Sequence, residues 1–213
     1  MQTPPTPPTS PAAAQRLLLI FVAVAGMLVL VAGALLLYAM RDRPQGAAGS
    51  ALSAMIGGKF SLTDQNGKPF TDADMKGKWQ LVFFGYTHCP DVCPTTLNEL
   101  SLAFDKLGPS AKNKIGVVFI TVDPDRDTAA VLKEYVSSFS APVVALTGAA
   151  PNIAQAAKDY RVYYAKHPTK DGGYDMDHSA LIYVMDPEGR FTASFAPDDP
   201  ADKIAERMKK LLS

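Results

Sequence analysis

The chain has 213 residues, of which 47% are hydrophobic, and its 21 basic residues are balanced by 21 acidic ones. A chain of this length allows one or two domains. The net charge is near zero and the sequence has no stripe of basic residues, so nucleic acid is not an expected partner.

The first quarter of the chain does not resemble a folded domain. Residues 1–15 are rich in proline, threonine, serine and alanine, and predict a disordered tail because such a composition cannot bury a core. Residues 17–38 are apolar and uncharged. A helix crosses a bilayer with about 20 such residues, whereas the apolar region of a cleaved signal peptide has about 7 to 15. We therefore expect a retained membrane anchor over 16–40. The few flanking arginines leave its orientation open.

Glycine, alanine and serine over residues 41–58 predict a flexible tether. Residues 59–213 are then long enough for a single buried core. The run over 60–64 with the turn over 65–68 predicts an opening hairpin, and the continuous apolar run over 79–85 predicts a central strand buried on both faces. Further helices are expected over 95–107, 151–160 and 200–212, with one more that begins after Asp127 or Thr128, and further strands over 115–122, 142–146, 180–185 and 190–195.

Strands that alternate with helices, followed by a hairpin and a last helix, are typical of an α/β sandwich around a mixed sheet. A cysteine loop follows the first buried strand. The pattern therefore predicts a thioredoxin-like (peroxiredoxin-like) fold, a mixed sheet flanked by helices, preceded by one N-terminal transmembrane helix.

Cys89 and Cys93 are the only cysteines of the chain, and they stand where the central strand gives way to a helix. Residues spaced by four on a helical turn share one face, so the pair can close a disulfide or hold one metal ion. Pro90 and Pro94 stiffen the loop because each fixes φ and removes an amide donor. A helix N-terminus just beyond favours thiolates. The common alternative for such a pair is a structural disulfide or packing in a core.

His178 is the third candidate ligand. It directly precedes the strand expected at 180–185, which in a sheet of this kind brings it beside the cysteine loop. Two thiolates and one imidazole suit Cu(I) and also zinc, and the ligand set does not choose between them. His167 is expected on the surface. His88 stays open because it adjoins Cys89 but points away if the backbone there is extended.

The residues before His178 offer further roles. Asp175 and Asp177 are candidates to orient the His178 ring as hydrogen-bond acceptors, with a solvated acidic loop as the default interpretation. Met176 is expected to pack or to be exposed rather than to bind a metal.

Four segments read together resemble the SCO/SenC family of copper-binding cytochrome oxidase assembly proteins. They are GYTHCPDVCP at 85–94, VDPDRDT at 122–128, and DHS at 177–179 with DPEG at 186–189. The match spans essentially the whole expected domain. The resemblance implies a single membrane helix and a thioredoxin-like domain outside the cytoplasm, which for a bacterial protein means the inner membrane and the periplasm.

The resemblance also implies that Cys89, Cys93 and His178 bind copper, as Cu(I) and in some family members Cu(II). The copper passes to the binuclear centre of cytochrome c oxidase, which makes the copper-centre subunit of the oxidase and a copper donor protein the expected partners. The same two cysteines would form the redox pair of a thiol-disulfide exchange on that subunit. Asp123 and Asp127 fall in an acidic loop shared by the family. There they help to dock a partner or lie near the metal, or Asp123 simply ends a strand and Asp127 caps a helix.

Several functions therefore remain open from sequence. The leading one is a metallochaperone that holds Cu(I) by three ligands. The second is a thiol-disulfide oxidoreductase in which Cys89 attacks and Cys93 resolves. The others are a peroxidase-like enzyme with Cys89 as the peroxidatic thiol, and a zinc site at the same three residues.

Overall fold

The computed structural model describes residues 20–21, 24–34 and 56–212. Residues 20–21 and 24–34 are helical, while the predicted tail, the rest of the predicted anchor and most of the predicted tether lie outside the described residues. None of the helices in the described ranges is both long and apolar enough to cross a bilayer. The division into tail, anchor, tether and domain therefore stays a prediction.

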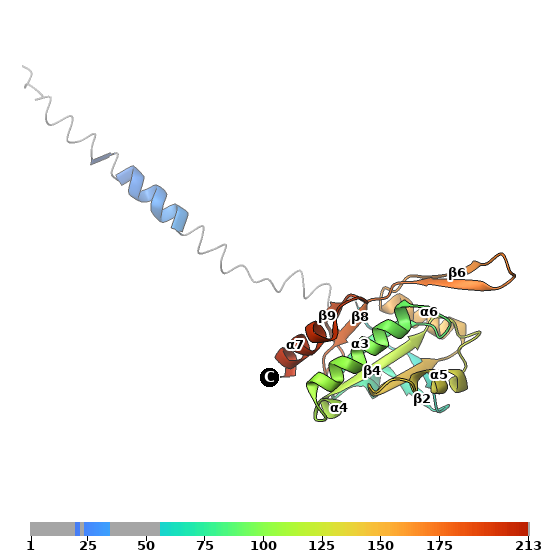
Figure 1. Ribbon diagram of the computed structural model, residues 1–213. Helices are drawn as coiled ribbons and strands as arrows, with labels where there is room; N and C mark the ends of the chain where they lie inside the picture. Colours follow the sequence, from blue (N-terminus) through green and yellow to red (C-terminus); the bar gives the residue numbers. More distant parts are fainter. Residues whose placement is uncertain (1–19, 22–23, 35–55, 213) are drawn as a thin grey trace, which may run out of the picture. The chain divides into compact units, whose positions relative to one another are not determined.

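A mixed sheet of seven strands, in the order β2-β1-β5-β4-β3-β8-β9, forms the centre of the domain (Figure 1). β4 runs parallel to β3 and to β5, whereas β8 is antiparallel to β3 and to β9, and β1 is antiparallel to β2 and to β5. The mixed sheet predicted from the sequence is confirmed. Its strands are β1 (Ser61–Asp64), β2 (Pro69–Thr71), β3 (Trp79–Gly85), β4 (Ile115–Thr121), β5 (Val143–Thr147), β8 (Ile182–Met185) and β9 (Phe191–Phe195).

The helices follow the expected order, and α3 and α7 lie side by side (Figure 1). α3 begins at Val92 rather than at residue 95, which places Cys93 inside the helix. α5 is capped by Thr128, whose side chain accepts from the amide of Val131, and not by Asp127. The helices are α3 (Val92–Leu107), α4 (Ala111–Lys114), α5 (Ala129–Val136), α6 (Ala150–Asp159) and α7 (Ala201–Leu212), with a 3-10 turn η1 (Asp72–Met75).

β3 is buried on both faces, and its last residue sets how closely α3 approaches. The ring of Phe84 lies 5.3 Å from that of Tyr160, which follows α6. A side chain at position 85 would point to the opposite face of the sheet. A Cβ there would stand 2.7 Å from the Phe119 ring and 2.8 Å from the Sγ of Cys93. Glycine at this position therefore lets α3 bring Cys93 against the end of β3.

The structure contains a second sheet that the sequence analysis missed. β6 (Tyr164–Pro168) and β7 (Tyr174–His178) form an antiparallel hairpin that extends from the body of the domain (Figure 1). The polar side chains and Pro168 of this stretch are more typical of a loop than of a strand. The overlooked signal is Gly172-Gly173 in the turn between two short runs. His178 is thus the last residue of β7 and does not directly precede β8.

Candidate metal centre

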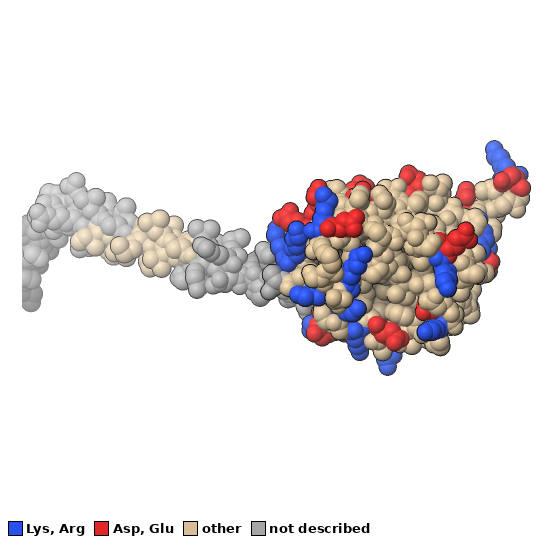
Figure 2. All heavy atoms as spheres, turned by 60° about the horizontal axis from the view of Figure 1, so that its bottom comes forward, with Lys and Arg blue, Asp and Glu red and all other residues tan. Residues whose placement is uncertain are grey.

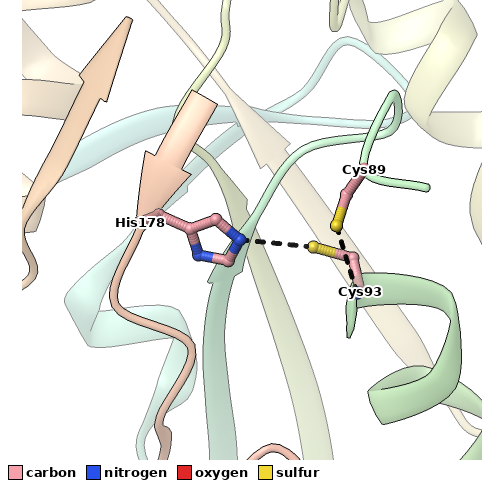
Figure 3. A group of neighbouring side chains, drawn as sticks. All are labelled: Cys89, Cys93 and His178. Carbon is pink, nitrogen blue, oxygen red and sulfur yellow. Dashed lines mark hydrogen bonds between the residues drawn. The ribbon is translucent and has the colours of Figure 1, made fainter. Parts of the chain in front are cut away.

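Cys89, Cys93 and His178 meet at the N-terminal end of α3 (Figure 3). Their donor atoms all lie within 4.8 Å of one another. The Nε2 of His178 is 3.6 Å from the Sγ of Cys93, although the two residues are 85 positions apart in the chain. The fold therefore assembles the three residues that the sequence analysis selected.

The start of α3 positions the two sulfurs. Cys93 is fully buried, while Cys89 lies half-buried in the loop before the helix. The amide of Cys93 donates to the Sγ of Cys89 at 3.5 Å (Figure 3). The sulfur of Cys89 therefore satisfies one of the free amide donors at the helix N-terminus. Cys89 and Cys93 are not joined by a disulfide in this structure.

The two thiols have opposite pKa shifts. The pKa of Cys89 is lowered from 9.0 to about 5, chiefly by a hydrogen bond from the side chain of Cys93, with help from the amides of Cys93 and Asp91. The pKa of Cys93 is raised, because this thiol keeps its proton to donate that hydrogen bond and because burial disfavours its charged form. At neutral pH the half-buried sulfur of Cys89 is a thiolate and the buried sulfur of Cys93 is a thiol.

We expect iodoacetamide to alkylate Cys89 long before Cys93, because only the thiolate reacts and only Cys89 is both ionised and accessible. Since the Cys89 pKa is about 5, its alkylation rate should hold a plateau through neutral pH and fall on acidification with a midpoint near that value. Peptide mapping by mass spectrometry measures both rates. In Cys89→Ser, the remaining thiol should stay unmodified until denaturant is added. Equal rates, or a midpoint near pH 9, would contradict the assignment.

His178 presents its Nε2 to the thiols. Its Nδ1 lies 3.3 Å from the carbonyl oxygen of Ser179. Because a carbonyl only accepts, we place the ring proton on Nδ1, which leaves a lone pair on Nε2. The ring also packs edge-on against Tyr86, with centroids 5.7 Å apart. This is the tautomer that binds a metal ion through Nε2.

The carboxylates beside His178 do not orient its ring. Asp177 pairs with His167, whose Nε2 is 2.9 Å from the carboxylate. Asp175 is the cross-strand neighbour of His167. Residues alternate along β7, so both aspartates face away from the side that carries Met176 and His178. Met176 is buried and packs in the core.

A buried carboxylate holds the cysteine loop in place. Asp127 is 0% exposed. It accepts from the amide of Thr87 at 3.0 Å, from the hydroxyl of Thr87 at 2.6 Å, and from the hydroxyl of Thr121 at 2.6 Å. Thr87 stands two residues before Cys89, so these bonds tie the loop to the end of β4. Asp127 thus anchors the loop that carries Cys89 instead of capping α5, which was one of the roles considered from sequence.

The other residues of the acidic loop and the first histidine lie outside the donor cluster. Asp123 is buried, and it accepts from the hydroxyl of Tyr174 at 2.8 Å and from the Nε of Arg126. It therefore links the loop after β4 to β7. His88 is 52% exposed, with its Nδ1 3.1 Å from the Thr87 hydroxyl.

The sequence analysis missed the residues that support the site, namely Tyr86, Thr87, Thr121, Arg126 and Tyr174. Three of them lie within the segments that carry the family resemblance, which was the only signal for them. Their contacts join segments about 40 to 50 residues apart. No spacing rule predicts such contacts.

Charged side chains are mixed on the surface drawn in Figure 2. Lysines and arginines alternate there with carboxylates, and among the coloured residues no stripe of one sign crosses this face. A polyanion would therefore find no continuous basic track on it.

The geometry fits a small soft metal ion. Metal bonds of about 2.3 Å to thiolate sulfur and about 2.0 Å to imidazole nitrogen would separate the donors of a trigonal ion by about 3.7 to 4.0 Å. The 3.6 Å between Cys93 and His178 is close to these values, and no two of the three donors are more than 4.8 Å apart. Soft ligands of this kind suit Cu(I) and zinc.

Fold and site together define a class of protein: a thioredoxin-like domain that presents two thiols and an imidazole at the start of the helix after its central strand. A family model described as SCO1/SenC matches residues 48–213. The chain belongs to the SCO1/SenC family.

Relatives with known structures share this fold. ScoI of Bradyrhizobium japonicum, solved with copper bound, is 52% identical, with a TM-score of 0.68 over 73% of this chain and 98% of that chain. ScoI of Arabidopsis thaliana, also solved with copper bound, is 39% identical, with a TM-score of 0.70 over 74% of this chain and 98% of that chain.

Curated relatives are longer than this chain. The mitochondrial SCO1 homolog 1 of Arabidopsis thaliana is 40% identical over 161 residues, which are 76% of this chain and 48% of the relative. The chain thus spans about half the length of the curated relatives it matches.

Proposed function

We propose that this protein is a copper chaperone that carries Cu(I) on Cys89, Cys93 and His178 and assists the assembly of the copper centre of cytochrome c oxidase. The observation that carries the proposal is the convergence of two sulfurs and a lone-pair nitrogen within 4.8 Å. Membership of the SCO1/SenC family and a 52% identical relative with copper bound support copper over zinc.

The three side chains suit both capture and release of the ion. Cys89 already carries a thiolate at neutral pH, and His178 directs its Nε2 toward the sulfurs. Cys93 must give up its proton to become a ligand, so binding at neutral pH releases about one proton. Three ligands leave a coordination position open, through which a sulfur of the acceptor can enter before the ligands of this chain leave.

We further propose that residues 16–40 anchor the protein in the bacterial inner membrane and that the domain lies in the periplasm. The support for the anchor is the uncharged apolar run over 17–38. The copper-centre subunit of the oxidase is the proposed acceptor, and a copper donor protein is the proposed source.

A titration of the reduced full chain with Cu(I), in competition with a chelator, tests the function. We expect one-to-one binding, and we expect His178→Ala to weaken it at least about tenfold, or about 1.4 kcal/mol. His167→Ala is the matched control and should bind as the parent does, because His167 pairs with Asp177 outside the site. The copper proposal fails if the parent does not compete with the chelator, or if zinc displaces Cu(I) from it.

The opposite pKa shifts of the cysteines favour a second function, thiol-disulfide exchange. The Cys89 thiolate would attack a disulfide of the oxidase subunit and release one of its thiols. Cys93, after losing its proton, would then attack the Cys89 sulfur, which frees the second thiol and leaves a Cys89–Cys93 disulfide. The dithiol supplies both electrons. A reduction potential far below about −300 mV would mark a structural disulfide and count against this function.

A further inference from the structure

The strand that carries His178 is not hydrogen-bonded to the main sheet. Within the described ranges, β6 and β7 pair only with each other. The position of the His178 ring relative to the thiols therefore depends on side chains that fasten the hairpin to the domain. This dependence bears on the proposed function only because His178 is taken there as a copper ligand.

Arg126, in the loop after β4, contacts Tyr174, the first residue of β7. Its Nη1 donates to the carbonyl oxygen of Tyr174 at 3.0 Å, and its guanidinium lies 3.9 Å from the centroid of the Tyr174 ring. Its Nε pairs with Asp123, which also accepts from the Tyr174 hydroxyl at 2.8 Å. Arg126 and its partner thus hold both the backbone and the side chain of one β7 residue.

The same guanidinium reaches toward the metal centre through Tyr86. It lies 5.8 Å from the centroid of the Tyr86 ring. Tyr86 is buried and packs edge-on against the His178 ring, with centroids 5.7 Å apart. The carbonyl oxygen of Tyr86 accepts from the amide of Cys89 at 3.3 Å. Tyr86 therefore contacts both the cysteine loop and the histidine.

The ion pair with Asp123 does not by itself explain why the guanidinium of Arg126 is partly buried. Its Nη2 is buried and has no hydrogen-bond partner among the residues that the structure describes. Burying a polar donor without a partner is unfavourable, so other interactions of the same group must offset it. The two tyrosine rings provide them, because a desolvated guanidinium is attracted to aromatic faces.

We propose that Arg126 is a positioning residue: it holds β7 against Tyr86 and so keeps the Nε2 of His178 within reach of the thiols. It does not touch the metal. The loss of Arg126 should therefore weaken copper binding only through His178, which distinguishes positioning from a general loss of stability.

A double-mutant cycle on the reduced full chain tests this. We expect Arg126→Gln to weaken Cu(I) binding about tenfold, the lower end of the range for residues that support a ligand. In a His178→Ala background the same change should have no further effect, because the ligand it positions is gone. Equal losses in both backgrounds would overturn the proposal.

Two more variants accompany the double-mutant cycle. Arg126→Lys keeps the charge but loses the planar group that stacks, so it should recover only part of the affinity. If Arg126→Gln does not fold, Arg126→Lys carries the same comparison. Arg190→Gln is the matched control, since it removes an arginine whose Nε pairs with Asp186 at 2.7 Å, in the turn between β8 and β9. It should leave copper affinity unchanged.

A measurement without metal separates this proposal from the proposed function. In the NMR spectrum of the metal-free full chain, the ring protons of His178 should show a shift from the neighbouring Tyr86 ring. Arg126→Gln should remove that shift and leave the signals of His88 unchanged. If the parent chain fails to bind Cu(I), the copper function fails while this result still decides the role of Arg126. Unchanged His178 signals would refute it.

Discussion

Replacing Cys93 by serine is expected to weaken Cu(I) binding by more than about 100-fold, beyond the 10- to 100-fold typical of residues that only support a ligand. The change removes a soft ligand and puts a hard hydroxyl oxygen in its place. The serine hydroxyl can still donate a hydrogen bond to the Cys89 sulfur, so the expected loss comes from the missing sulfur ligand.

Chelator competition at neutral pH measures this loss, and circular dichroism checks that the variant is folded. Cys89→Ser is the natural comparison, because it removes the other sulfur at a half-buried position. We expect a loss of similar size. If either serine variant held Cu(I) as tightly as the parent, the three-ligand site would be wrong.

Replacing Asp127 by alanine is expected to lower the free energy of unfolding by about 3 kcal/mol or more. Three donors lose their acceptor, the amide and hydroxyl of Thr87 and the hydroxyl of Thr121. Each donor left buried and unsatisfied costs about 1 to 3 kcal/mol. Asp127→Asn keeps the shape and one acceptor oxygen, so it should be milder.

Urea unfolding followed by fluorescence measures this change. Trp79 is the only tryptophan of the chain and lies in β3, so its signal reports on the domain. Asp125→Ala is the control, because Asp125 is exposed and pairs with Lys166 at the surface. It should leave the unfolding midpoint unchanged. An Asp127→Ala variant as stable as this control would show that the carboxylate does not anchor the loop.

The main sheet and its helices were predictable because their sequences carry strong periodic patterns. The apolar run of β3 reads as a buried strand, and Asn66-Gly67 between β1 and β2 reads as a turn. The three donor residues were also found, since cysteines and histidines are few. That the three residues act together as one copper site followed only from the family resemblance.

The hairpin and the supporting contacts were harder to predict. β7 is a polar strand at the surface and was not predicted. Without a strand there, the sequence gives no reason to expect Asp175 and Asp177 to face away from His178. Arg126, Tyr86 and Tyr174 come together from three separate segments, which depends on how the chain folds in space rather than on local spacing. Periodicity describes each element by itself and not the side chains that connect them.

The difference in burial between the two cysteines sets an order of events. Solvent reaches Cys89 but not Cys93. In the proposed transfer of copper, an acceptor reaches the ion from the open side, so we expect Cys89 to be displaced before Cys93. The difference in burial would then give the transfer a direction.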